Sequence, residues 1–393
     1  MISFDNTEVA FGGKSDKDLQ WSYRLFNLMG KPWLVKVGSF AANTALTLRL
    51  PIKGMIKKTI FKQFCGGESI GDCEQKMNDL AKFNIGTILD YSVEGKTTEA
   101  DLDHTRDEII ATIKRAKGNK HIPFSVFKIT GISRTALLEK WNKTDAKLTA
   151  EEEKELQVVL ARVDAICKAA FEAAVPVFID AEDSWFQEAI DRMANQMMAK
   201  YNTQKAIVYN TIQMYRHDRL AFLKKTYEEA KAGNYFAGIK LVRGAYMEKE
   251  RAKAAAEKYP DPIQPTKEAT DRDYNLALEF MINHLDKFAI CAGTHNEKSS
   301  AHLVALMTQH TISKNDPRIY FAQLLGMSDH ISFNLAHAGY NVAKYVPYGP
   351  VREVMPYLMR RAQENTSVAG QMGRELSLIV KEKARRKKVR STK

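Results

Sequence analysis

The sequence predicts an α/β fold, a (β/α)8 barrel preceded by an N-terminal helical arm. Past about residue 84, short β-rich runs alternate with helical runs. Eight such units fill about 280 residues, the size of a (β/α)8 barrel. Polar or titratable residues follow the strand runs, as they do at the functional end of such barrels. A doubly wound sheet is the competing architecture, but the count of eight and the lack of a Rossmann glycine fingerprint argue against it.

The expected elements follow the chain in order. Strands are expected at Ile85–Val93, Pro123–Thr130, Pro176–Ala181, Ala206–Gln213, Phe236–Val242, Phe288–Ala292, Ile319–Leu325 and Val342–Val346. The helical runs between them include Ala150–Ala174, Lys267–Leu285, Glu297–Gln309 and Asp329–Ala338. Residues 1–84 form the helical arm, in which the Lys-rich, Gly-containing segment Lys53–Gly67 is expected to be a loop. Residues 85–375 form the barrel domain, and residues 376–393 form a basic tail.

Composition indicates an ordinary globular protein. Its 393 residues are 45% hydrophobic and 27% charged, enough for one barrel-sized domain with a smaller appendage. The four cysteines lack metal-binding spacing and fit reduced, packed thiols in a reducing compartment. The N-terminus has no apolar signal region, and the longest apolar stretch, Trp33–Leu50, is interrupted by charged and polar residues. We therefore expect a cytoplasmic protein, with Trp33–Leu50 as an amphipathic helix.

The net charge of +12 is concentrated at the C-terminal end. Lys381–Lys393 holds eight Lys or Arg and one Glu, so only +5 remains for the preceding 380 residues. We expect this tail to be disordered, and such a tail can contact anionic lipid headgroups or nucleic acid. A solvated tail without a function is an equally good interpretation. Peripheral attachment at the inner face of the cytoplasmic membrane is the hypothesis that this charge and Trp33–Leu50 suggest.

The stretch from Tyr345 to Asn365 carries the most specific chemistry. It leaves a strand, turns at Gly349-Pro350 and enters a helix. On that helix one face carries Tyr357, Arg360, Arg361 and Glu364, at i, i+3, i+4 and i+7. Two adjacent guanidinium groups between an aromatic ring and a carboxylate can grip a small carboxylate ligand. Taken alone, an Arg-Arg pair favours a solvated helix face, and the rest of the chain shifts the balance towards a binding site.

The ends of the strands extend this candidate site. The residues in question are Asp90, Lys128, Asp180, Glu182, Gln213, Arg243, Thr294, His295, Gln323 and Tyr345. Lys240, inside its strand, points into the barrel or belongs to the same rim. The basic residues favour an anionic ligand, and Gly244 with the turn at 294–296 suits phosphate groups. There is no nucleophile elbow, zinc helix or Walker loop. The sequence thus indicates a cofactor that does the chemistry itself, and no metal.

Seven motifs lie in order on these strands and on the arginine helix. They are Phe127-Lys128, Phe178-Ile179-Asp180-Ala181-Glu182, Ile212-Gln213-Met214-Tyr215, Lys240-Leu241-Val242-Arg243-Gly244-Ala245-Tyr246, Gly293-Thr294-His295-Asn296, Gln323-Leu324-Leu325-Gly326-Met327, and Tyr345 with Tyr357-Leu358-Met359-Arg360-Arg361-Ala362-Gln363-Glu364-Asn365. In this combination the chain resembles the FAD-dependent proline dehydrogenases over roughly residues 80 to 370. The resemblance implies a distorted (β/α)8 barrel with FAD at the carboxyl ends of the strands.

The resemblance also implies a reaction and its partners. L-proline would be oxidised to Δ1-pyrroline-5-carboxylate by hydride transfer to flavin N5, the first step of proline degradation to glutamate. The electrons would pass to membrane quinone. Because the sequence shows no aldehyde dehydrogenase domain, a separate pyrroline-5-carboxylate (glutamate semialdehyde) dehydrogenase would take the product. No specific nucleic acid is implied.

Roles for the site residues follow residue by residue from the motifs. Arg360, Arg361 and Lys128 would hold the substrate carboxylate, and Asp180 would support Lys128. The pyrrolidine ring would be walled by Tyr357, Tyr345, Tyr246 and Leu324, and Glu364 would orient the arginine helix. The flavin would be bound by Gln213, Lys240, Arg243, Gly244, Ala245, Thr294, His295 and Asn296. Some family members carry Arg where Lys240 stands, so the chain departs from their pattern at the position expected to contact flavin N5.

Two other functions stay open on the sequence. The first is that of a related flavin dehydrogenase that acts on hydroxyproline or another cyclic secondary amine. The aromatic Tyr345 favours proline, because its phenol would crowd a 4-hydroxyl group. A non-catalytic basic protein that binds membrane or nucleic acid through its tail is the alternative from another class. It predicts no flavin and salt-sensitive binding of nucleic acid.

Overall fold

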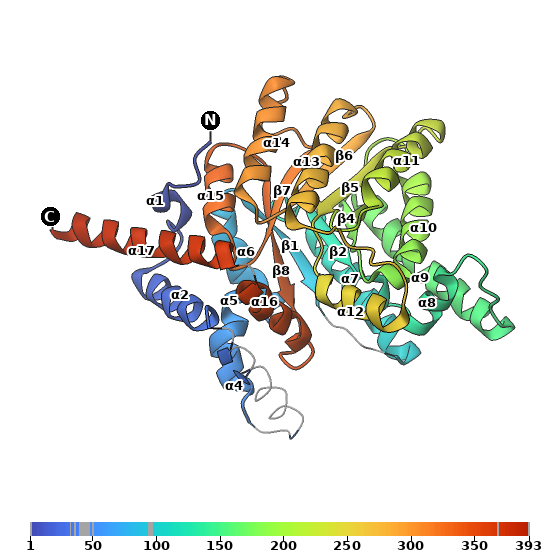
Figure 1. The fold of residues 1–393 in the computed structure, drawn as a ribbon, viewed down its shortest axis with the longest axis horizontal. Coiled ribbons are helices and arrows are strands. Elements are labelled where there is room, and N and C mark those ends of the chain that lie inside the picture. The colour runs from blue at the N-terminus through green and yellow to red at the C-terminus, as the bar shows by residue number, and fades with distance from the viewer. Residues whose placement is uncertain are drawn as a thin grey trace. The chain divides into compact units, whose positions relative to one another are not determined.

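Eight parallel strands close a barrel in chain order in the computed structural model (Figure 1). The structure describes residues 2–31, 33–34, 37–38, 48, 51–92, 97–367 and 369–391, and the side chains of 363–372 are not described. The strands are β1 (Ile85–Tyr91), β2 (Phe124–Phe127), β3 (Val177–Ile179), β4 (Val208–Gln213), β5 (Ala237–Val242), β6 (Phe288–Gly293), β7 (Ile319–Leu324) and β8 (Val342–Tyr348). Each expected strand is confirmed within a few residues, and so is the (β/α)8 class.

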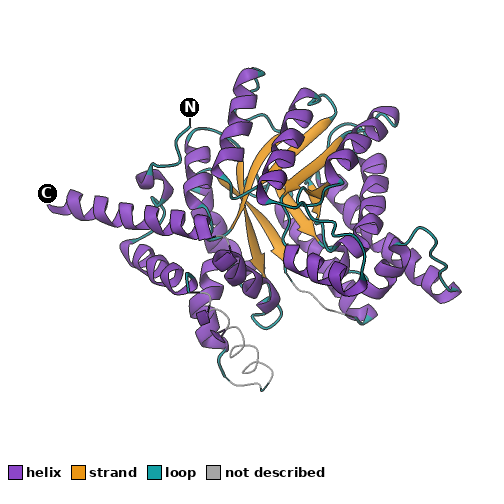
Figure 2. Ribbon diagram, viewed as in Figure 1, coloured by secondary structure: helices purple, strands orange, loops and turns teal. Residues whose placement is uncertain are grey.

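Helices alternate with the strands along the chain (Figure 2). They are α7 (Glu99–Ala116), α8 (Thr135–Asn142), α9 (Ala150–Ala173), α10 (Ser184–Tyr201), α11 (Arg219–Ala232), α12 (Met247–Glu257), α13 (Lys267–Asn283), α14 (Glu297–Gln309), α15 (Asp329–His337) and α16 (Met355–Ser367). Several begin at side-chain caps that the sequence displays, at Thr98, Thr149, Thr266 and Asn296. These side chains accept hydrogen bonds from the first-turn N–H groups and so fix where each helix starts.

By their internal contacts, the residues form two compact units. One consists of Met1–Glu94 together with Gln323–Lys393, and the other is Gly95–Ala322. The first unit contains β1 and β8, which pair in parallel from Ile85↔Val342 to Tyr91↔Tyr348. The second contains β2 to β6, whose parallel registers run through Phe178↔Tyr209 and Lys240↔Cys291. The boundaries 84 and 375 expected for the barrel domain stay a prediction.

An aromatic layer fills the base of the barrel in the second unit. The ring of Phe124 stacks on Phe178 at 4.4 Å between centroids. Phe124 also meets Tyr209 and Tyr320 edge-on, at 5.5 and 4.8 Å. These rings come from four different strands, so they point to the strands' shared inner side. Because side chains alternate along a strand, the residue two positions beyond each ring points the same way.

The N-terminal arm is more helical than expected. It contains α1 (Thr7–Ala10), α2 (Asp16–Met29), α4 (Lys53–Ile56), α5 (Lys62–Phe64) and α6 (Glu74–Ala81), with a π-helical turn at Lys57–Phe61 and a 3-10 turn at Gly71–Cys73. The expectation of a loop at Lys53–Gly67 is therefore wrong for residues 53–64 and holds only for 65–67. Ile56, Phe61 and Phe64 are buried in one cluster with Phe11 and Phe26, and this apolar contact outweighs the local Lys and Gly content. Most of Trp33–Leu50 lies outside the described residues.

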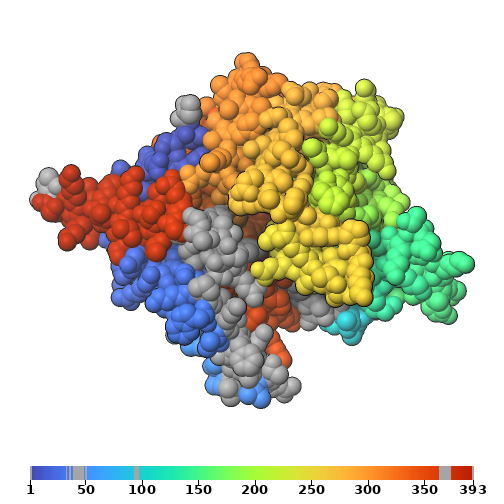
Figure 3. Space-filling model, in the orientation of Figure 1, coloured from blue at the N-terminus to red at the C-terminus, as the bar shows by residue number. Residues whose placement is uncertain are grey.

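The basic C-terminal segment is also a helix. α17 (Ala369–Ser391) packs against α1 and α2 and lies on the surface in Figure 3. Arg386 anchors it: its guanidinium donates to the carbonyl oxygens of Phe11 and Lys14, at 2.9 Å each, and pairs with Asp16 at 2.8 Å. Glu382, fully buried, also accepts from Arg386. The expected disorder of residues 376–393 is corrected for 376–391, because Arg386 is bound by an acidic side chain and backbone carbonyls some 370 positions away in the sequence.

Candidate active site

Four of the predicted site residues share the inner side of the barrel in the second unit. Lys128 and Asp180 continue the alternation that begins at Phe124 and Phe178. On β4, Gln213 faces the same side as Tyr209. On β5, Lys240 faces the same side as Gly238, which pairs with Tyr209, so both side chains point inward. Lys128 has an extended backbone, with φ −109° and ψ 140°, so the alternation of side chains along β2 continues to this residue, one position past the end of the strand. Strand alternation thus places these polar groups above the aromatic layer.

Asp180 lies between two lysines. One carboxylate oxygen accepts a hydrogen bond from Lys240 Nζ, and the other lies 3.7 Å from Lys128 Nζ. Lys240 is only 4% exposed, and its ammonium sits 5.2 Å from the centroid of the Phe178 ring. The sequence left the direction of Lys240 open and paired Asp180 with Lys128 alone. The structure shows that Lys240 points inward and that Asp180 joins both lysines.

Arg243 is the centre of a second cluster. Its Nε donates to Asp271 at 2.6 Å, and its two terminal nitrogens donate to Thr294 Oγ1 at 2.6 Å and Ser299 Oγ at 2.9 Å. The guanidinium also stacks 4.4 Å from the centroid of the Tyr274 ring. Burial alone would raise the pKa of Asp271, but hydrogen bonds from Lys267 and Arg243 hold it below its usual range. The arginine is therefore fixed in one orientation before any ligand arrives.

Thr294 and Asn296 form the turn that starts α14. Thr294 Oγ1 accepts from the N–H of Asn296 at 3.0 Å, and the Asn296 side chain accepts from the N–H of Ser299 at 3.1 Å. Arg243 and Thr294, each predicted to bind the cofactor, are thus brought together at a helix N-terminus, which favours anions. His295, between Thr294 and Asn296, is half-buried.

Gln213 connects β4 to the loop after β3. Its side-chain amide donates to the carbonyl oxygen of Glu182 at 2.7 Å. The carboxylate of Glu182 in turn accepts from the hydroxyl of Thr130 and, at 3.1 Å, from its N–H. Three successive strand ends are therefore linked through one buried acid.

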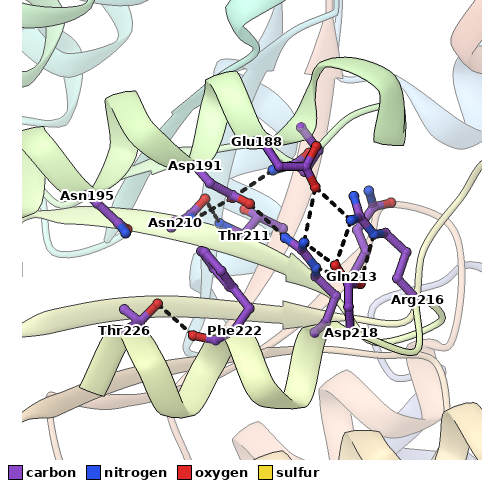
Figure 4. A network of polar contacts seen from close by, with 12 residues as sticks. Glu188, Asp191, Asn195, Asn210, Thr211, Gln213, Arg216, Asp218, Phe222 and Thr226 are labelled. Carbon is purple, nitrogen blue, oxygen red and sulfur yellow. Dashed lines mark hydrogen bonds and ion pairs between the residues drawn. The ribbon is translucent and has the colours of Figure 1, made fainter. Parts of the chain in front are cut away.

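A network of ion pairs on the outer side of β4 supports the chain that follows Gln213 (Figure 4). Asn210 donates from β4 to Asp191 of α10 at 2.9 Å, and Arg219 donates to the other oxygen of Asp191 at 2.7 Å. Arg216 reaches Glu188 and Asp218, at 2.7 Å each. Burial raises the pKa of the Asp191 carboxyl. The sequence analysis missed this network, although Arg216, Asp218 and Arg219 stand together in the sequence.

Gly244 holds a backbone conformation that side chains rarely adopt. Its φ is +135°, and a Cβ atom there would lie 2.5 Å from the ring of Tyr215. The N–H of Tyr215 donates to the carbonyl oxygen of Arg243 at 2.7 Å, so this ring is held directly beneath the glycine. The following residues, exposed Ala245 and half-buried Tyr246, lead into α12.

Gly244→Ala is expected to lower the free energy of unfolding by about 3 kcal/mol, because backbone strain and overpacking add. Gly118→Ala is the matched control. Its φ is also positive, at +71°, but nothing lies within 4 Å of a Cβ there, so about 1 kcal/mol of strain is expected. Chemical denaturation of both variants measures the difference. Equal losses would show that the Tyr215 contact carries no cost.

The remaining predicted residues lie in the first unit. On α16, Arg361 is 7% exposed, and its guanidinium carbon is 5.2 Å from the centroid of the Tyr357 ring. Arg360 is half-buried, and the side chain of Glu364 lies outside the described residues. Tyr345 is buried on β8, and its carbonyl oxygen accepts from the N–H of Leu325 at 2.9 Å. The structure thus pairs Tyr357 with Arg361 and joins the end of β7 to Tyr345.

A family model described as proline dehydrogenase matches residues 73–374, well over half of the chain. The chain belongs to the proline dehydrogenase family. Members of this family are flavin-dependent oxidoreductases, which confirms the resemblance and the class of enzyme read from the motifs.

Two curated proline dehydrogenases illustrate the relationship. The chain is 34% identical to "Proline dehydrogenase 1, mitochondrial" of Dictyostelium discoideum over 384 residues, covering 87% of this chain and 67% of that protein. It is 42% identical to the human protein of the same name over 244 residues, covering 61% of this chain. That match spans only 41% of the human protein's length.

A crystal structure of proline utilization A from Bdellovibrio bacteriovorus, inactivated by N-propargylglycine, shares the fold of this chain. The TM-score is 0.71 at 18% sequence identity, and the similarity covers 91% of this chain and 38% of that one. No helix among the described residues is long and apolar enough to cross a membrane.

The residues of the second unit fit a flavin dinucleotide. Arg243 has five N–H donors, of which the contacts with Asp271, Thr294 and Ser299 use three. Two donors on a pre-oriented guanidinium, beside the N-terminus of α14, suit a phosphate group. Gly244 is exposed and adds backbone that carries no side chain of its own. Asp271, Ser299 and Tyr274 were missed from the sequence, although Asp271 and Tyr274 share one face of α13 at i, i+3.

Proposed function

We propose that this chain oxidises L-proline to Δ1-pyrroline-5-carboxylate with FAD and passes the electrons to membrane quinone. The reaction would be the first step of proline degradation to glutamate, and a separate pyrroline-5-carboxylate dehydrogenase would take the product. The observation that carries the proposal is the Lys128–Asp180–Lys240 group, with Lys240 buried and its two partners half-buried, on the inner side of a proline dehydrogenase barrel. It supplies fixed positive charge where an amino acid carboxylate and a flavin are to be bound.

The proposed binding roles divide among the chain's own residues. Lys128, Arg360 and Arg361 hold the substrate carboxylate, and Tyr246, Leu324, Tyr345 and Tyr357 wall its ring. Bound FAD supplies the hydride acceptor at flavin N5. Arg243, Thr294 and Asn296 hold its phosphates through the donors described above, with Gly244 and Ala245 as exposed backbone beside them. Gln213, Lys240 and His295 complete the binding set, and Glu364 orients the arginine helix.

These residues act by orientation and electrostatics. A planar guanidinium binds a carboxylate through two parallel hydrogen bonds, so it fixes the direction of the substrate as well as its location. The side chains around the pyrrolidine ring exclude water and restrict its rotation. This restriction aligns one C–H bond for hydride transfer. Asp180 keeps the two lysine ammonium groups in place, so Lys128 reaches the carboxylate without rearrangement at the moment of binding.

An absorbance spectrum recorded before and after anaerobic addition of L-proline tests the proposal. We expect flavin bands that bleach with L-proline and respond little to trans-4-hydroxy-L-proline. Bleaching by trans-4-hydroxy-L-proline alone would instead identify the chain as a hydroxyproline dehydrogenase. Failure to reconstitute the protein with FAD would refute the proposed enzymatic function. The alternative of a non-catalytic protein that binds membrane or nucleic acid would then remain. Reoxidation by a soluble quinone analogue then tests the electron acceptor.

We also propose a cytoplasmic location with peripheral attachment to an anionic membrane surface, since the acceptor is lipid-soluble. The exposed Trp33, Val37 and Leu48 support it. The tail supports it less, because Arg385, Arg386 and Arg390 pair with acids of α1, α2 and α17. Co-sedimentation with anionic and neutral vesicles is the test, and equal pelleting with both would contradict an electrostatic attachment.

A further inference from the structure

Lys344 is a fully buried lysine on the outward side of β8. Its side chain is 0% exposed, and Nζ contacts three oxygen acceptors. They are the carbonyl oxygens of Met327 at 2.5 Å and Leu324 at 3.3 Å, and Asp329 Oδ1 at 2.9 Å. An ammonium group has three N–H donors, so these acceptors use all of them. The second oxygen of Asp329 pairs with another lysine, Lys14, at 3.0 Å.

The three acceptors of Lys344 lie at the two ends and the middle of one short loop, residues 324–329. Its backbone needs support, because Gly326 and Ser328 have positive φ values of +75° and +51°. Gln63 donates to the carbonyl oxygen of Gly326 at 2.9 Å, and Glu375 accepts from the N–H of Ser328 at 2.9 Å. Among the contacts described for this loop, Lys344 is the side chain that bridges two of its carbonyls.

This lysine stands between two residues that the proposed function places around the substrate ring. Tyr345 follows it on β8 and therefore points to the opposite, inner side of the barrel. Leu324 is bound to it through a carbonyl oxygen, and the next N–H, that of Leu325, donates to the carbonyl of Tyr345. The separation of the Leu324 and Tyr345 side chains thus depends on how closely Lys344 draws the loop to β8.

We propose that Lys344 is a positioning residue that sets the wall formed by Leu324 and Tyr345, and through it the discrimination between L-proline and its 4-hydroxylated analogue. The proposal rests on the proposed function. A misplacement of about 1 Å at a substrate-positioning contact can cost about 100-fold in rate. Loosening the wall removes the crowding by the Tyr345 phenol, so the larger ring gains relative to proline.

Lys344→Met and Lys14→Met form the matched pair that tests this. Both remove a lysine partner of the buried Asp329, but the contacts described for Lys14 include no carbonyl of the loop. In Lys344→Met we expect the ratio of kcat/KM for L-proline over trans-4-hydroxy-L-proline to fall by about tenfold, mostly through the KM of proline. In Lys14→Met the ratio stays within about twofold of the wild type, although the melting temperature falls. Lys344→Gln, whose amide keeps two donors, should recover part of the ratio.

A second readout does not depend on turnover. With 3-fluorotyrosine incorporated at Tyr345, the 19F resonance of the wild type should be a single line that Lys14→Met leaves in place. Lys344→Met should shift it or split it. Equal effects of the two methionine variants on ratio and resonance would reduce Lys344 to a structural ion pair and overturn the proposal. A wild type that does not oxidise proline would refute the proposed function, while the resonance would still report on the positioning.

Discussion

Arg361→Ala is expected to raise the KM for L-proline by about 30-fold while FAD stays bound. Losing a charge-assisted hydrogen bond to a carboxylate costs about 2 kcal/mol, and each 1.4 kcal/mol is about a factor of ten in affinity. Arg361 is buried against Tyr357, so its guanidinium is oriented before the substrate binds. Steady-state kinetics with L-proline and the flavin absorbance of the purified variant measure the two expectations.

Two further variants separate the guanidinium from general charge. Arg352→Ala removes an exposed arginine from the turn before α16 and should leave KM unchanged. Arg361→Lys keeps the charge but loses the planar fork, so we expect an intermediate KM. Unchanged proline kinetics in Arg361→Ala would remove this residue from the carboxylate site.

The strands of the barrel could be predicted because their signal is local. Each is a short apolar run bounded by turn residues, and the eight runs recur at barrel spacing. The two segments that were predicted wrongly depend on contacts far away in the sequence. Residues 53–64 are helical because Ile56, Phe61 and Phe64 pack in one buried cluster with Phe26 of α2 and with Phe11, which precedes α2. The C-terminal segment is ordered because Arg386 meets Asp16, which no local composition reveals.

In the candidate site, too, some features could be predicted from local sequence and others depend on contacts far away in the chain. Alternation along each strand predicts which side a residue faces, so the inward direction of Lys128 and Asp180 could be read from the sequence, whereas that of Lys240 was left open. Which acid meets which base depends on the register between neighbouring strands. That register places Lys240 against Asp180, although the motifs suggested Lys128 as the partner. The roles of these residues toward proline and FAD stay predictions.

Asp180→Asn should therefore have a large effect on both stability and catalysis. The substitution keeps the size of the side chain but removes the negative charge that Lys128 and Lys240 share. Removing one partner of a buried ion pair typically costs about 3–5 kcal/mol. We expect the free energy of unfolding to fall by about 3 kcal/mol and kcat/KM for L-proline to fall about 100-fold, because Lys128 loses its support.

Asp164→Asn provides the matched control in the same unit. Asp164 pairs with Lys200 at 2.7 Å and accepts from the hydroxyl of Tyr201 at 2.7 Å, but the Lys200 end of the pair is exposed to solvent. Exposed ion pairs contribute about 1 kcal/mol or less, so this variant should stay close to the wild type in both measurements. Denaturant unfolding and steady-state kinetics of the two variants compare a carboxylate whose side chain is 14% exposed with one that is 34% exposed. If Asp180→Asn loses stability but keeps its kcat/KM, the carboxylate holds the barrel together without orienting Lys128, and its role in the substrate site is refuted.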